Sequence, residues 1–88
     1  MIRERDVEKY FVKKVKDLGG TAEKFTSPQR RSVPDRLVIM PGGRICFVEL
    51  KAPGKKPTEA QARDHEHRRA LGCRVFVLDS LEAVDAWL

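Results

Sequence analysis

The stretch from Val33 to Lys51 constrains the fold most, because it holds two apolar runs separated by a turn-forming cluster. Residues 37–40 form the first run, residues 45–48 form the second, and Pro41-Gly42-Gly43 lies between them. Apolar runs of this length on either side of a proline and glycine cluster are typical of two strands joined by a tight reversal. We therefore predict a β-hairpin.

The register of this hairpin decides where its carboxylates lie. If Met40 pairs with Arg44 around a three-residue loop, Asp35 lies opposite Glu49, and their side chains emerge on one face about 5 Å apart. A two-residue Gly42-Gly43 turn would shift the pairing by one and weaken this apposition.

Two ionised carboxylates at this distance repel each other unless a cation or a shared proton compensates. Lys51 follows Glu49 by two residues and so points to the same face of the strand. Two carboxylates and one lysine at the end of a strand are the groups that a divalent metal and an attacking water require.

Length and composition predict one intracellular domain spanning residues 1–88, in the cytoplasm or nucleoid, or in the host cytoplasm for a viral protein. The chain is 41% hydrophobic and 35% charged, as an ordinary globular protein is. No apolar run approaches the roughly 20 residues that cross a bilayer, so we expect no membrane partner. Cys46 and Cys73 lie in apolar strand patterns and are expected to be reduced.

The charge balance favours an anionic partner such as a nucleic acid. Lysine and arginine outnumber aspartate and glutamate by 18 to 13, and the calculated pI is about 9.6. Loops beside the hairpin carry polar and basic residues that can grip a phosphate backbone without reading bases, or can simply be solvated connections. These candidates for nucleic-acid binding are Gln29, Arg30, Arg31, Lys55 and Lys56.

The other elements follow from periodicity and from capping residues. We predict a helix over residues 5–18, an edge strand over 21–26, a helix from Thr58 to Leu71, a strand over 73–78 and a short final helix. The order is α-β-β-β-α-β-α. A right-handed crossover from the second hairpin strand to the last strand makes these two parallel. The predicted fold class is α/β, a mixed central sheet flanked by helices.

Two helical residues have both a structural and a functional interpretation. Glu8 is either an ordinary exposed helix residue or a group at the edge of the core that points towards the hairpin. Gln61 either completes a capping box with Thr58 or takes part in the chemistry. His65 and His67 project about 200° apart on a helix, so we interpret the run around them as a solvated face rather than a metal site.

Pro34-Asp35 followed by Glu49-Leu50-Lys51 resembles the motif of the PD-(D/E)xK nuclease superfamily, whose restriction-endonuclease-like fold agrees with the predicted sheet. Glu8, Gly19-Gly20, Gln61 and Gly72 make the chain more similar to its VRR-NUC family, the virus-type replication and repair nucleases, in a small stand-alone form. Such proteins commonly carry a glycine shortly before the aspartate, whereas this sequence reads Ser32-Val33-Pro34.

The resemblance implies a catalytic set of Glu8, Asp35, Glu49, Lys51 and Gln61. It implies that Asp35, Glu49 and the Leu50 carbonyl hold Mg²⁺ or Mn²⁺, and that Glu8 holds a second ion or acts through water. One-metal and two-metal chemistry both stay open. Lys51 would orient or deprotonate the attacking water, or stabilise developing charge.

The resulting hypothesis is a metal-dependent DNA endonuclease of replication, repair or recombination, selective for structure rather than sequence. It would need no small organic cofactor. A domain this small hardly covers a duplex alone, so a homodimer is expected. The alternatives are a four-way junction resolvase of the same superfamily, and a non-catalytic nucleic-acid-binding module whose carboxylates form only structural ion pairs.

Overall fold

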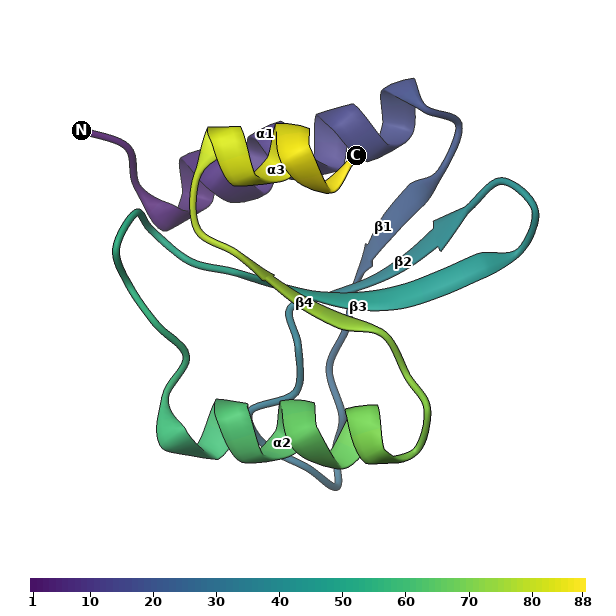
Figure 1. The fold of residues 1–88 in the computed structure, drawn as a ribbon, viewed down its shortest axis with the longest axis vertical. Coiled ribbons are helices and arrows are strands. Elements are labelled where there is room, and N and C mark those ends of the chain that lie inside the picture. Colours follow the sequence, from purple (N-terminus) through teal and green to yellow (C-terminus); the bar gives the residue numbers. More distant parts are fainter.

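The computed structural model describes all 88 residues and has the predicted order of elements. The elements are α1 (Glu4–Asp17), β1 (Thr21–Lys24), β2 (Arg36–Met40), β3 (Arg44–Leu50), α2 (Glu59–Ala70), β4 (Val75–Leu78) and α3 (Leu81–Trp87). The strands form one sheet in the order β1-β2-β3-β4, in which β4 runs parallel to β3 and the other pairs are antiparallel. Helices α1 and α3 lie on one side of the sheet and α2 lies on the other (Figure 1). The predicted α/β fold class is confirmed.

The hairpin has the register that brings the carboxylates together. Met40 pairs with Arg44, and at the other end of the ladder Arg36 pairs with Val48. The loop is made possible by Gly42 and Gly43, whose φ angles of 87° and 76° are in the left-handed region that glycine adopts without steric cost. The two-residue alternative is therefore wrong, and the next pair beyond the ladder places Asp35 opposite Glu49.

The main core lies between the sheet and the layer of α1 and α3. Alternate residues of a strand point to opposite faces, so the even-numbered positions of β3 enter this core and the odd-numbered ones face α2. The fully buried members include Val7, Phe11, Val15, Val38, Val48, Leu50 and Val84. Trp87 packs its ring edge-on against Phe11. The main core lies on this face of the sheet, whereas the other face, which carries Phe47 and Glu49 of β3, is covered by α2.

Helix α2 is held against the sheet with no large apolar residue of its own. Alanine is its only apolar residue type, and its two buried members are Asp64 and His65. The Arg68 guanidinium lies over the rings of Phe25 and Phe47, 5.2 and 4.9 Å from their centroids. The sequence predicted a solvated face around His65 and His67. This prediction is wrong for Asp64 and His65, which are buried.

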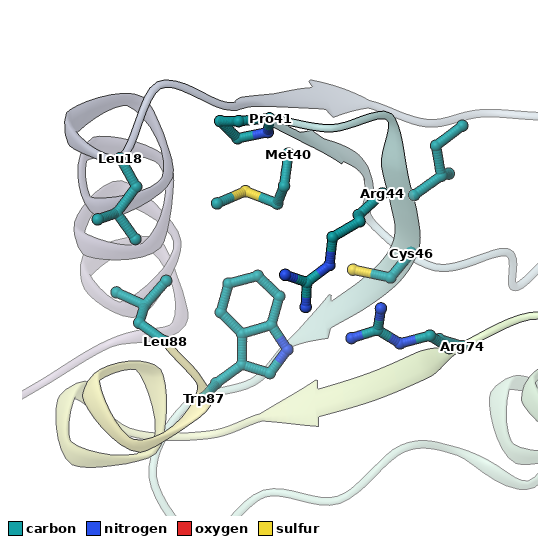
Figure 2. Close-up of a pocket in the computed structure, with 9 residues that line it drawn as sticks. Leu18, Met40, Pro41, Arg44, Cys46, Arg74, Trp87 and Leu88 are labelled. Atoms are coloured by element: carbon teal, nitrogen blue, oxygen red, sulfur yellow. The ribbon is translucent and has the colours of Figure 1, made fainter.

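The turn end of the hairpin carries an apolar pocket of about 310 Å³. Figure 2 shows Leu18, Met40, Pro41 and Trp87 around it, together with the side chains of Arg44 from β3 and of Arg74, which directly precedes β4. The pocket lies at the opposite end of β2 from Asp35, and so it belongs to a different part of the molecule from the carboxylates. Among the helices, none combines the length and the apolar character that crossing a membrane requires.

Candidate active site

Asp35 and Glu49 meet where β2 begins and β3 ends. The Leu50 amide donates a 2.8 Å hydrogen bond to Asp35 Oδ2, which fixes the aspartate against the end of β3. Glu49 is only 1% exposed. Burial, and then the neighbouring Asp35 carboxylate, raise the pKa of Glu49 to about 8, with Lys51 acting in the opposite direction. The protein without a metal thus disfavours the second negative charge at this point.

Lys51 lies on the same face as the carboxylates, as the strand period predicts. Its Nζ is 3.6 Å from Glu49 Oε2, and its side chain is 13% exposed. The Lys51 amide donates to the carbonyl of Leu78 in β4, which anchors the main chain just beyond the last residue of β3. When both carboxyl groups are ionised, one ammonium group beside them leaves an excess of negative charge.

Gln61 completes the capping box and also contacts Glu49, while its part in the chemistry stays a prediction. Its main-chain amide donates to Thr58 Oγ1, and its Oε1 accepts from the Thr58 amide, so the capping box is complete. The remaining end of the same side chain, Nε2, donates to Glu49 Oε2 at 3.3 Å. The start of α2 is therefore tied to the candidate site by the residue that caps it.

His65 is a site residue that the sequence did not reveal. Its Nε2 lies 3.5 Å from Glu49 Oε1, both side chains are 2% exposed, and neither of these two atoms has a hydrogen-bond partner. Burial, and then the nearby Arg69, lower the pKa of His65, which favours the neutral imidazole. One turn along α2 from Gln61, His65 thus faces the other oxygen of the same carboxylate.

The buried side of α2 has the periodicity of a core-facing helix, but the residues that show it are polar. Gln61, Asp64, His65 and Arg68 have the i, i+3, i+4, i+7 spacing of a helix stripe that faces a core. Burial alone would raise the pKa of Asp64, yet hydrogen bonds from Arg68 and Arg30 outweigh it and lower that pKa. Paired in this way, the carboxylate can be buried at a tolerable cost.

Glu8 is on a different side of the sheet from the carboxylate pair. Its Oε2 accepts a 3.0 Å hydrogen bond from Arg36 Nε, and Arg36 also donates to the carbonyl of Ala22. Because Arg36 follows Asp35 directly along an extended chain, the two side chains leave in opposite directions. A catalytic or metal-binding role for Glu8 stays a prediction.

The predicted basic residues lie in the two loops on either side of the sequence motif. Arg30 is half-exposed and bound to the buried Asp64 at 3.1 Å, so part of its role is structural. Arg31, Lys55 and Lys56 are exposed and form no ion pair, and Gln29 is exposed as well. Arg30, Arg31 and Arg63 line a pocket of about 410 Å³ beside α2, and Arg63 is an addition to the predicted set.

The donor set at the carboxylate pair fits a hard divalent cation. Glu49 Oε1 is a buried carboxylate oxygen without a hydrogen-bond donor, and Asp35 raises the pKa of Glu49 as a second anion beside it. Such an oxygen is stabilised by a cation. No three side chains of His, Cys, Asp or Glu are grouped as metal ligands, so the protein offers two carboxylates and leaves positions for main-chain oxygen, water and substrate.

Comparison with known proteins agrees with this geometry. No family model matches the sequence. A solved structure described as a VRR_NUC domain superposes with a TM-score of 0.90 at 40% identity, covering 98% of this chain and 94% of the other. A protein named "Putative nuclease p44", from Acyrthosiphon pisum secondary endosymbiont phage 1, is 58% identical over 80 residues, which are 91% of this chain and 86% of that protein.

The fold and the motif define a nuclease-type domain of the PD-(D/E)xK superfamily. Within it, the chain belongs to the VRR-NUC family.

Proposed function

We propose that the protein is a metal-dependent DNA endonuclease, which hydrolyses phosphodiester bonds at the site formed by Asp35, Glu49 and Lys51. The observation that carries the proposal is the apposition of Asp35 and the buried Glu49, whose Oε1 has no donor and whose pKa is raised to about 8. A fold gains no stability from burying such a pair alone. A bound Mg²⁺ or Mn²⁺, one or two per site, would relieve this cost.

Asp35, Glu49 and the Leu50 carbonyl would hold the ion. When bound, the ion neutralises charge on the scissile phosphate and lowers the pKa of a bound water. Lys51 is near enough to Glu49 to donate to a water or to a phosphate oxygen there. Gln61 holds Glu49 Oε2 and so limits the orientations that this carboxylate can take. Glu8 would reach the site only through water or through a second ion.

The basic loops favour a nucleic-acid substrate held by its backbone. Arg31, Lys55 and Lys56 have no acidic partner and are free to contact phosphates, as Gln29 is to donate to them. All four phenylalanines take part in ring contacts inside the protein, which leaves few rings for stacking bases. This supports selection by the structure of the DNA, in replication, repair or recombination.

Plasmid nicking tests the proposal. Wild type is expected to nick DNA with Mg²⁺ or Mn²⁺ and not with chelator, and Asp35→Ala or Lys51→Ala is expected to lose about a hundredfold or more of the rate. Glu82→Ala removes an exposed carboxylate from α3 and serves as the matched control. Equal background cleavage by all these proteins would leave a non-catalytic binding module.

Substrate and assembly are tested with the same protein. Duplex, flap and four-way junction DNA are cut side by side; symmetric paired nicks at the junction with flaps untouched would identify a resolvase instead. The homodimer stays a prediction, and sedimentation analysis with and without DNA checks it.

A further inference from the structure

We propose that the groove between α1 and β1 binds the phosphodiester backbone of a nucleic acid, at a distance from the scissile phosphate. The groove encloses about 460 Å³. Its cationic members are Arg5, Lys9, Lys13, Lys16, Lys24 and Arg36. The inference extends the proposed nuclease function by naming a second contact surface for the substrate.

The groove accounts for the net charge of the whole protein. It contains six cationic side chains and one anionic one, Glu8, a balance of +5 that equals the formal net charge of the chain. The remaining residues carry twelve cations and twelve anions. The excess positive charge therefore lies in one concave surface, while the rest of the protein is neutral overall. Such a distribution of charge is typical of a site that binds a polyanion.

Most of these cations have no partner inside the protein. Lys13 pairs with Asp17, and Arg36 pairs with Glu8. The other four, Arg5, Lys9, Lys16 and Lys24, form no ion pair, and Arg5, Lys9 and Lys16 are exposed along one side of α1. They are thus available to a ligand.

The spacing of the cations along α1 is unfavourable for the helix itself. Arg5, Lys9 and Lys13 follow one another at i, i+4 intervals, where like charges destabilise a helix. An exposed helix face gains more from alternating signs, as at Lys13 and Asp17. Phosphates bound in the groove would neutralise these charges and remove the repulsion between them.

The groove also opens at the correct end of the sheet. Lys24 pairs with Arg36, which directly follows Asp35, so one end of the groove lies at the strand end that carries the candidate site, on the opposite face of the sheet. Helix α1 then runs towards the turn end of the hairpin and leads into β1 (Figure 1). From Arg5 to Lys16 the helix rises about 16 Å, the axial length of about five phosphates on one strand of a duplex.

Binding of a short labelled DNA duplex, measured by fluorescence anisotropy in chelator so that no cleavage occurs, tests the inference. Lys9→Gln/Lys16→Gln removes two exposed, unpaired charges and keeps good helix formers. The matched control Arg44→Gln/Arg74→Gln removes two charges from exposed residues at the apolar pocket instead.

The groove variant is expected to bind at least about tenfold more weakly than wild type at low salt, and its slope of log affinity against log salt is expected to fall by about two. The control is expected to retain most of the affinity, and thermal unfolding checks that both variants fold. Equal losses in the two variants, or an unchanged slope in the groove variant, would overturn the proposed site.

Binding and nicking assays distinguish a failure of the groove proposal from a failure of the nuclease proposal. A wild type that binds through the groove but never nicks DNA would keep this inference and end the nuclease proposal. A groove variant that binds and nicks as wild type does would end this inference and keep the nuclease. If the groove instead serves anionic lipid, the variant loses binding to phosphatidylserine vesicles and keeps its affinity for DNA, which also contradicts the inference.

Discussion

His65 Nε2 lies 3.5 Å from Glu49 Oε1. The side chains of both residues are 2% exposed, and neither of these two atoms has a hydrogen-bond partner. The imidazole is therefore placed to orient the carboxylate from above the sheet while Gln61 holds its other oxygen. This relationship joins the stability of α2 to the geometry of the candidate site.

Replacing His65 with alanine is expected to lower both the stability of the protein and its nicking activity. Because α2 has no large apolar side chain, the lost packing should lower the free energy of unfolding by about 1–3 kcal/mol. The nicking rate should fall as Glu49 loses its orientation. Urea unfolding and plasmid nicking measure the two effects. His67→Ala, on the exposed side of the same helix, should stay within about 0.5 kcal/mol of wild type; a similar loss in both variants would contradict this placement.

Substitution of Gln61 can separate its two roles. Gln61→Glu retains the capping box, since glutamate also bonds back to the cap residue. It also places a carboxylate where an amide donates to Glu49 Oε2. The nicking rate is expected to fall about tenfold or more, in line with the loss of a hydrogen bond to a charged group, while helicity by circular dichroism stays unchanged. Full activity in Gln61→Glu would show that the cap is its whole role.

The raised pKa of Glu49 predicts a pH dependence of stability without metal. A carboxyl group whose pKa is higher in the folded state stabilises the fold while it is protonated, and this contribution is lost as pH rises to the folded pKa of about 8. The lowered pKa of His65 acts oppositely, but only below its ordinary value of 6.5. From pH 6.5 to about 8, the Glu49 contribution should therefore appear alone.

Chemical unfolding in chelator measures this window. The free energy of unfolding is expected to fall with pH by at most roughly 1.4 kcal/mol per unit. In Glu49→Gln the free energy of unfolding should depend much less on pH over this window. A wild type whose stability is level over this window, or a Glu49→Gln variant with the same slope, would contradict the raised pKa.

Ser32 is the place where the sequence departs from the glycine expected before the aspartate. Its φ angle is 62°, in the left-handed region where a non-glycine residue is strained. Ser32→Gly is expected to relieve this strain and to raise the free energy of unfolding by up to about 1 kcal/mol. Thermal unfolding at neutral pH tests this, and a decrease would show that the serine side chain contributes more than the strain costs.

Several features were predictable from the sequence because they rest on local rules. The Pro41-Gly42-Gly43 turn and the strand period of two predicted the side on which Lys51 lies, and they predicted the apposition of Asp35 and Glu49 for the three-residue loop that the structure has. The capping box of α2 was also visible in the residues themselves. Each of these depends on neighbours in the chain or on one register.

The buried side of α2 was not predictable by the same means. Periodicity is read from apolar residues, and the stripe that packs on the sheet consists of Gln61, Asp64, His65 and Arg68. Their burial is stabilised by partners distant in the chain, such as Arg30 for Asp64 and Glu49 for His65. The same holds for Glu8, whose partner Arg36 depends on how α1 crosses the sheet.

The proposed nuclease chemistry requires that Asp35 and Glu49 hold a divalent cation. A crystal of the wild-type protein soaked with Mn²⁺, measured at a wavelength where manganese scatters anomalously, tests it directly. We expect one anomalous peak or two at the carboxylate pair, with carboxylate oxygens of both residues about 2.0–2.6 Å from an ion. An empty site, with Glu49 still paired to Lys51 and His65 at saturating Mn²⁺, would contradict it.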